Sequence, residues 1–189
     1  YANSKCLQLK TIEELRELRR HGLGIAYMGL ESGDDPTLAR MRKGASAEEM
    51  IAMGQKAKAA GIPLSITVLL GIAGPERSAV HAMETGRVLS AIDPEFVGAL
   101  SLMLEPETAL HAEIQAGRFV LPEPLDILRE LRAMIEATNL SNGLFHANHA
   151  SNYLPVRAKL PEDKARTLAL LDQALAGALA LKPEFLRAL

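Results

Sequence analysis

Three short runs of apolar residues organise the chain, and each run ends in glycine or in charged residues. The runs cover residues 25–30, 64–70 and 96–104. Nearly uninterrupted apolar runs of this length are typical of strands that are buried on both faces of a sheet. We therefore expect three strands at these positions.

Apolar residues recur at helical spacing between and after these runs. Two of the predicted helices begin with a capping box, in which Thr11 pairs with Glu14 and Ser46 pairs with Glu49 to satisfy backbone amides of the first turn. Directly after the first strand, Asp34 is expected to cap a short helix. Apart from this short helix, the predicted helices cover residues 11–22, 46–61, 75–92, 108–117, 124–139 and 161–181, and residues 144–152 form a polar segment between the last two.

The strands and helices alternate along the first part of the chain. Strands that alternate with helices at this spacing form right-handed βαβ units, which place the strands parallel. The sequence therefore predicts an α/β fold with a parallel sheet. A complete eight-stranded β/α barrel needs about 250 residues, so a chain of 189 residues is too short for one.

Unusual residues follow all three predicted strands. The first strand is followed by Glu31, the second by the turn from Gly71 to Gly74, and the third by Glu105. In parallel α/β folds these carboxyl ends meet at one edge, the rim, where ligands bind. Carboxylates there accept hydrogen bonds from ligand hydroxyls, and a glycine turn lets backbone amides approach a ligand. The alternative, which the residues alone leave open, is that Glu31 and Glu105 only stabilise the helices that follow them.

The composition narrows the class of protein. Apolar residues make up 48% of the chain and charged residues 23%, which is close to globular averages and argues against a disordered chain. The net charge of −2 gives no general attraction to nucleic acid or to an anionic membrane. Because no apolar run approaches the roughly 18 residues of a membrane helix, we expect a cytoplasmic protein without a membrane or nucleic-acid partner.

The single cysteine and two nearby histidines limit the metal chemistry. Having only Cys6 excludes an internal disulfide, a four-thiolate zinc site and an iron–sulfur cluster held by this chain's own thiols. His146 and His149 are three residues apart, but a zinc site needs further ligands and none is near in sequence. We predict no metal site and interpret residues 146–153 as a hydrogen-bonded loop that closes the rim. Its expected turn residues are Asn148, Ser151 and Asn152.

A longer pattern runs through the first two predicted strands. It reads Met28-Gly-Leu-Glu-Ser-Gly33, then Lys43-Gly44 after a short helix, then Ala60-Gly-Ile-Pro63 and Leu69-Leu-Gly-Ile-Ala-Gly74. In order and spacing this pattern resembles the radical S-adenosylmethionine (radical SAM) superfamily. The resemblance is to the branch that includes oxygen-independent coproporphyrinogen oxidases and methylthiotransferases, and it covers about residues 1–107.

The resemblance implies a partial β/α barrel of six units, of which this chain would be the second half. Residues 1–107 would supply the fourth to sixth strands, and residues 108–189 a helical C-terminal extension. Residues 1–3 would be the exit of the third strand, and the missing N-terminal half of the barrel would be the partner. The family's Cys-x3-Cys-x2-Cys signature is absent from this sequence. The resemblance therefore places SAM and the [4Fe–4S] cluster, which together yield a 5′-deoxyadenosyl radical, in the whole enzyme, with no cluster held by this chain's own thiols.

The resemblance also assigns cofactor-binding residues, one at a time. Glu31 matches the strand-end position that contacts SAM, and Lys43 matches a basic position that meets the SAM carboxylate in some relatives. Thr67 matches a position where some relatives use Asp on the ribose. Gly71 and Gly74 match the glycine turn that flanks the adenine. The alternatives are a helix cap for Glu31, a solvated helix end for Lys43 and a core position for Thr67, and the catalytic residues stay unknown.

Three functions are open on the sequence alone. In the first, the chain is part of a radical SAM enzyme and is inactive by itself. In the second, it is a lyase or hydrolase that uses Glu31 and Glu105 as acid and base, and turnover without SAM or iron would favour it. In the third, it is an inert barrel fragment that forms a homodimer through uncovered sheet edges.

Overall fold

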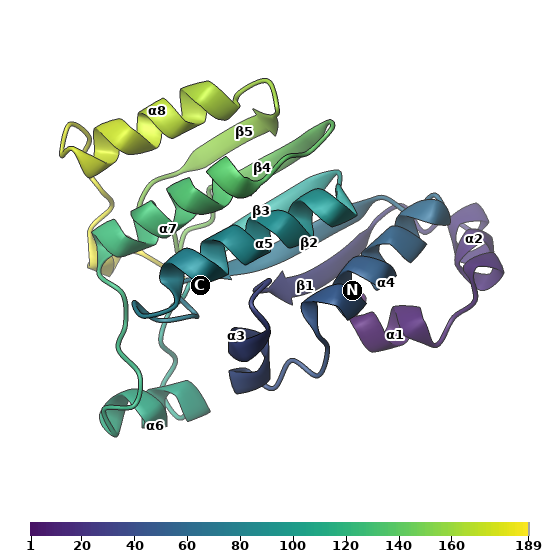
Figure 1. Ribbon diagram of the computed structural model, residues 1–189, viewed down its shortest axis with the longest axis horizontal. Coiled ribbons are helices and arrows are strands. Elements are labelled where there is room, and N and C mark those ends of the chain that lie inside the picture. Colours follow the sequence, from purple (N-terminus) through teal and green to yellow (C-terminus); the bar gives the residue numbers. More distant parts are fainter. Residues whose placement is uncertain (189) are drawn as a thin grey trace.

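A single five-stranded sheet forms the centre of the molecule in the computed structural model, which describes residues 1–188 (Figure 1). The strands lie in chain order, with the first four parallel and the last antiparallel to its neighbour. The expected α/β fold with parallel strands is confirmed. The strands are β1 (Ala26–Glu31), β2 (Leu64–Leu70), β3 (Phe96–Ser101), β4 (Gly143–Ala147) and β5 (Val156–Leu160).

The long helices lie side by side on one face of this sheet (Figure 1). They are α4 (Ala47–Ala59), α5 (Ser78–Ile92), α7 (Pro124–Ala137) and α8 (Lys164–Leu175). Consecutive parallel strands with every helix on the same face form a singly wound sheet, the arrangement of a β/α barrel wall, whereas doubly wound sheets carry helices on both faces. None of the described helices is long and apolar enough to cross a membrane.

The shorter helices surround the ends of the sheet. The helices α1 (Ser4–Gln8) and α2 (Ile12–Arg20) pack beside α4, and α3 (Asp35–Arg40) directly follows β1. In Figure 1, α6 (Ala109–Gln115) lies below the sheet at the end of two extended connections. A single 3-10 turn, η1 (Glu184–Leu186), precedes the C-terminus. Both predicted capping boxes are present, at the starts of α2 and α4.

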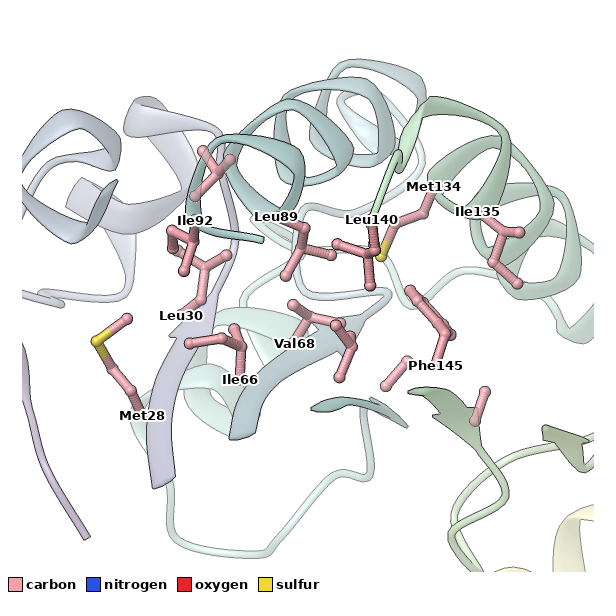
Figure 2. Packing of buried hydrophobic residues seen from close by; sticks show 14 of the residues in the cluster. Met28, Leu30, Ile66, Val68, Leu89, Ile92, Met134, Ile135, Leu140 and Phe145 are labelled. Atoms are coloured by element: carbon pink, nitrogen blue, oxygen red, sulfur yellow. The ribbon is translucent and has the colours of Figure 1, made fainter. Parts of the chain in front are cut away.

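The hydrophobic core fills the space between the sheet and the helices (Figure 2). Alternate strand residues point into it, and Met28, Ile66 and Phe145 are completely buried. Leu89 of α5 and Met134 of α7, which are buried to the same extent, face the strands from the helical side (Figure 2). The helices therefore bury the side chains of β1 to β5 on one face of the sheet only.

The opposite face of the sheet carries no helix layer, and its residues are half-buried or exposed. We call it the open face. It is formed by Tyr27, Gly29, Glu31, Ser65, Thr67, Leu69, Phe96, Gly98, Leu100, Leu144, His146, Arg157 and Lys159.

The expected helical character of residues 108–189 is wrong in its middle part. Two strands, β4 and β5, form there and extend the sheet that residues 1–107 begin. Each is only five residues long, and His146 interrupts the apolar residues of β4 while Arg157 and Lys159 interrupt those of β5, so neither gives a long apolar run. Leu189, the last residue of the expected extension, lies outside the described residues.

The last long helix is shorter than its predicted span of 161–181. It begins at Lys164 and ends at Leu175, and Gly177 follows with a φ of 79°. A left-handed glycine directly after a helix is a common terminator, which explains the early end. The third strand also stops before residue 104, at Ser101.

The first residues of the chain lie along the outer side of β1. Ala2 forms an isolated parallel bridge with Met28, and its amide donates to the Tyr27 carbonyl at 2.8 Å. Tyr1 also lies beside Tyr27, with 5.5 Å between the ring centroids. This position agrees with the expectation that residues 1–3 resemble the exit of a preceding parallel strand.

Candidate functional site

The end of β1 has an irregular backbone. The pairing register between β1 and β2 shifts between Gly29 and Glu31. Glu31 itself has a φ of 64°, a left-handed conformation that non-glycine residues rarely adopt. Bulges and such backbone strain are concentrated at functional sites, where they aim a side chain. Here they turn the Glu31 carboxylate back over the open face.

Glu31 and Lys43 form an ion pair at the rim. The Lys43 Nζ lies 3.1 Å from Glu31 Oε1, and each side chain is about a quarter exposed. The pair rests over Gly29, because a Cβ at that position would be 2.3 Å from Glu31 Oε1 and 3.1 Å from Lys43 Nζ. The structure thus brings together two predicted site residues that are twelve positions apart, and neither is a simple helix end.

Thr67 lies beside this pair on the open face of β2. The sheet register places it between Gly29 of β1 and Gly98 of β3. Its side chain is half-buried and lies on the face without helices. The alternative of a Thr packed in the helix-covered core is therefore wrong.

The predicted glycine turn follows β2, and its backbone is buried. Gly71 and Gly74 have φ values of 84° and 71°, and the Gly74 amide donates to the Gly71 carbonyl at 3.1 Å. The Gly71 amide donates to Glu130 Oε1 of α7 at 2.7 Å. This amide is therefore already satisfied by the protein and is not free for a ligand.

Side chains from three other segments cover the turn. A Cβ on Gly74 would come within 3.1 Å of the Phe119 ring, and one on Gly71 within 2.6 Å of Ile127. Arg40 of α3 stacks over Phe119, with its Cζ 4.6 Å from the ring centroid. Beside them lies a cavity of about 320 Å³ lined by Arg40, Gly74, Phe119 and their neighbours.

Glu105 stands apart from the other carboxylate. It is exposed in the loop after β3, where its backbone carbonyl accepts a hydrogen bond from Thr108. None of the contacts among residues 1–188 joins it to Glu31. The structure therefore does not assemble the two glutamates into an acid–base pair.

The predicted loop of residues 146–153 is only partly a loop, because His146 and Ala147 belong to β4 and residues 148–153 form the hydrogen-bonded loop. Ser151 and Asn152 are buried, and their side chains bind the Ser101 amide and hydroxyl at 3.2 and 2.8 Å. Asn152 also donates to the Ala99 carbonyl at 2.9 Å. The β3–β4 ladder ends at the pair of Gly98 with His146, so these side chains replace the missing backbone pairs. No group of three or more potential metal ligands occurs within residues 1–188.

A buried polar network beneath the rim was missed by the sequence analysis. His81 of α5 is completely buried, and its Nδ1 lies 2.7 Å from Ser32 Oγ in the turn after Glu31. Its Nε2 lies 3.4 Å from Glu130 Oε1 and makes no hydrogen bond. Glu130, only 2% exposed, also accepts from the Ser78 hydroxyl. The available signal was a glutamate within the apolar stripe of α7, since a buried carboxyl needs partners.

A second ion pair fixes the turn that follows β1. Arg77 donates to both carboxylate oxygens of Asp34, at 2.9 and 2.7 Å. The hydrogen bonds from Arg77 lower the pKa of Asp34, and their effect exceeds that of burial, which acts to raise it. As predicted, Asp34 also caps the helix after β1, because it accepts from the Thr37 amide at 3.1 Å. The turn that carries Glu31 is thereby held from both α3 and α5.

The C-terminal residues are fastened to the same rim. The Arg187 side chain is 4% exposed and donates to the carbonyls of Leu102 and Ser151 at 2.8 and 2.6 Å. Its Cζ lies 4.2 Å from the centre of the Tyr153 ring. Burial, together with the hydrogen bond to Glu184, raises the pKa of Tyr153 to about 12.

This pKa predicts a loss of stability in alkaline solution. A phenol whose pKa rises on folding favours the folded state below its ordinary pKa of 10.0, and that contribution is lost as the pH rises toward 12. We expect the free energy of unfolding to fall between pH 10 and 12, and to fall less in Tyr153→Phe. Urea unfolding at stepped pH measures this, and equal pH profiles for the two proteins would contradict it.

Comparison with known proteins adds one structural relationship. No protein-family model matches the sequence, and no curated protein matches it. Among solved structures, the fold is similar to coproporphyrinogen III oxidase (HemN) from Escherichia coli, described as a radical SAM enzyme, with a TM-score of 0.53 and 18% identity over 71% of this chain. The chain spans 31% of the length of that structure. At this identity the likeness concerns the fold alone, so the chain has an α/β fold similar to part of that structure.

Proposed function

We propose that this chain forms part of the SAM-binding rim of a radical SAM enzyme. The observation that carries the proposal is the Glu31–Lys43 pair, held at the end of β1 in a fold similar to that of a radical SAM enzyme. The sequence resemblance selects the same two residues. SAM would supply the adenosyl group from which such enzymes generate their radical.

The residues of the rim fit the charges of SAM. Its amino-acid end carries a carboxylate and an ammonium group, which match the Lys43 ammonium and the Glu31 carboxylate. The Thr67 hydroxyl, on the adjacent strand, can donate and accept at a ribose. The Gly71 amide does not contribute a hydrogen bond to SAM in this proposal, because it already donates to Glu130. Its turn, together with Gly74, would shape the adenine side through packing.

An iron–sulfur cluster does not fit the residues of this chain. Cys6 is the single thiol, and it is exposed on α1. The described residues contain no group of three potential metal ligands. In the proposal the cluster and its cysteines come from the N-terminal half of the barrel, which would meet the β1 edge beside Ala2. The chain alone is then inactive, and a cytoplasmic location stays a prediction.

The test is SAM binding by the chain itself. We expect weak binding, because the cluster that would hold the amino-acid end is missing, and at least fivefold weaker binding in Glu31→Gln and in Lys43→Gln. Gly29→Ala should have a similar effect, since its Cβ would displace the Glu31 carboxylate, the flexible end of a side chain, rather than backbone. Amide chemical shifts during a SAM titration give both the affinity and the location.

Glu48→Gln is the matched control. Glu48 also forms an exposed ion pair, 2.9 Å from Arg87, but it lies in the helix layer and should leave SAM binding within twofold. Equal effects of Glu31→Gln and Glu48→Gln would refute the assignment of the rim. If the rim binds SAM, adding the cluster-bearing half anaerobically should yield 5′-deoxyadenosine.

A further inference from the structure

Three arginines near α3 and α6 have no carboxylate partner. Arg40 is the last residue of α3 and Arg42 follows it, while Arg118 follows α6. Among residues 1–188, no carboxylate lies within ion-pair distance of any of the three, whereas Arg77 and Arg87 farther along the chain are both paired. Since arginine stays charged at all ordinary pH values, their positive charge is not compensated by a direct partner.

Two cavities open between these segments, and Arg40 lines both of them. The first has a volume of about 340 Å³ and is lined by Arg40, Arg42, Ile72 and residues 108–110 and 113. The second has a volume of about 320 Å³, and its lining includes Arg40, Arg118 and Phe119. Such volumes are at the lower end of those of small-molecule sites. There is therefore room for a small ligand beside Arg40.

Each cavity also has one carboxylate in its lining. Glu113 lines the first cavity and Glu76 lines the second. Neither carboxylate forms an ion pair among residues 1–188, so neither neutralises an arginine by direct contact. With three arginines against two glutamates, the lining of the two cavities together carries a positive charge.

Neutral groups hold the Arg40 guanidinium in place. Its Nη2 donates to the Ile72 carbonyl, and its Cζ lies 4.6 Å from the centre of the Phe119 ring. These contacts fix the plane of the guanidinium without cancelling its charge. Its Nε and Nη1 make no hydrogen bond within the described part of the chain. Because this arginine is already ordered, it loses little side-chain entropy when it binds an anion.

The wall opposite α3 belongs to a weakly packed arm that carries α6. No residue of α6 is buried, and residues with left-handed backbone, Glu107 and Gly117, lie on either side of it. Phe119, which is 5% exposed, anchors the arm against the turn at Gly74. In Figure 1, α3 and α6 both lie below the sheet. An anion bound by both Arg40 and Arg118 would therefore connect the arm with α3.

We propose that the space around Arg40, between α3 and α6, binds a small organic phosphate. A phosphate group has three acceptor oxygens and about two negative charges, so guanidinium groups on two sides can bind it together. A planar carboxylate has two oxygens and one charge and suits a single guanidinium. Arg42 and Arg118 complete the phosphate site on either side of Arg40, and Ile72 and Phe119 contact the organic part of the ligand.

This site is separate from the proposed SAM-binding residues. Neither Glu31 nor Lys43 lines the two cavities. Phosphate binding also requires neither SAM nor an iron–sulfur cluster. The inference therefore does not depend on the proposed function.

The experiment titrates phenyl phosphate into the 189-residue chain without SAM and follows amide chemical shifts. We expect saturable shifts at Arg40, Arg42, Gly74 and Arg118. Arg40→Gln should weaken binding at least tenfold, and Arg42→Gln and Arg118→Gln at least fivefold each. The Arg42 and Arg118 side chains are exposed and make no hydrogen bond within residues 1–188, so their variants should keep the melting temperature of the unmodified chain. Their weaker binding is then not explained by unfolding.

Arg20→Gln is the matched control. Arg20 is also exposed and has no ion pair among the described residues, but it lies on α2 and should leave binding within twofold. An equal loss in Arg20→Gln and Arg42→Gln would show that only net charge matters and would overturn the proposal. Shifts confined to Glu31 and Lys43, or no saturable binding at millimolar concentrations, would overturn it as well.

Three further probes test the chemistry of the ligand. Equally tight binding of benzoate would refute the phosphate assignment, and equally tight binding of phenol would show that the arginines do not recognise charge. Inorganic phosphate should bind more weakly than phenyl phosphate, and equal affinity would refute a site for an organic phosphate. Because the SAM titration uses Glu31 and Lys43 variants, which leave both cavities intact, failure of one test leaves the other unaffected.

Discussion

Glu130→Ala is expected to lower the free energy of unfolding by about 3–5 kcal/mol, because each buried donor left without its acceptor costs about 1–3 kcal/mol. Glu130 accepts from the Gly71 amide and the Ser78 hydroxyl and lies beside the His81 ring. The Gly71 amide and the His81 ring are buried beneath the rim, where water does not replace the lost carboxyl, whereas Ser78 is half-buried. Urea denaturation measures the change, provided that the dependence of the free energy of unfolding on urea concentration is the same in both proteins.

Two further variants separate this network from a general effect of helix α7. Glu130→Gln keeps one oxygen that can accept from the Gly71 amide, so it should lose clearly less stability than Glu130→Ala. Glu136→Ala removes an exposed glutamate of the same helix, where only its ion pair with Arg132 is lost, and should change stability by less than about 1 kcal/mol. A similar loss in Glu130→Ala and Glu136→Ala would mean that the network does not stabilise the fold.

Gly33→Ala is expected to disturb both the fold and the rim. A Cβ on Gly33 would lie 2.4 Å from the Glu84 carbonyl oxygen and 2.6 Å from the Thr85 nitrogen. These are backbone atoms of α5, so the clash is relieved only if the turn after β1 moves. Overpacking of this kind costs about 1–3 kcal/mol or more, and moving the turn would also strain the hydrogen bond from the Gly33 amide to the Thr85 hydroxyl, which is 2.8 Å long.

The measurement combines thermal unfolding with the SAM titration. Gly33→Ala should lower the melting temperature by several degrees and also weaken SAM binding, because the displaced turn carries Glu31. Gly24→Ala is the matched control, since nothing lies within 4 Å of a Cβ there. If the two variants have the same melting temperature and the same affinity for SAM, the close packing of this turn on α5 is not important for either property.

The sequence predicted the parts of the fold that have strong local patterns. The first three strands, the two capping boxes and the glycine turn follow from apolar runs and turn chemistry, and Glu31 with Lys43 follows from a resemblance in order and spacing. The strands β4 and β5 were missed because each has only five residues. A polar residue, His146 in β4 and Arg157 in β5, interrupts the apolar residues of each strand. Their pairing depends on contacts with β3 that are distant in sequence.

The interior of the site was less predictable than its edge. His81 and Glu130 are 49 residues apart and meet only because α5 and α7 pack side by side. The burial of the Gly71 amide has the same cause.

The antiparallel orientation of β5 makes the two edges of the sheet unequal. A parallel β/α series continues by adding a further strand in the same sense, but β5 runs opposite to β4 and ends that series. As the edge strand, β5 also carries Arg157 and Lys159 on its open face, and charged residues on an edge strand discourage pairing with another strand. Extension of this sheet by additional parallel strands is therefore favoured at the β1 edge, where Ala2 already occupies the first pairing position.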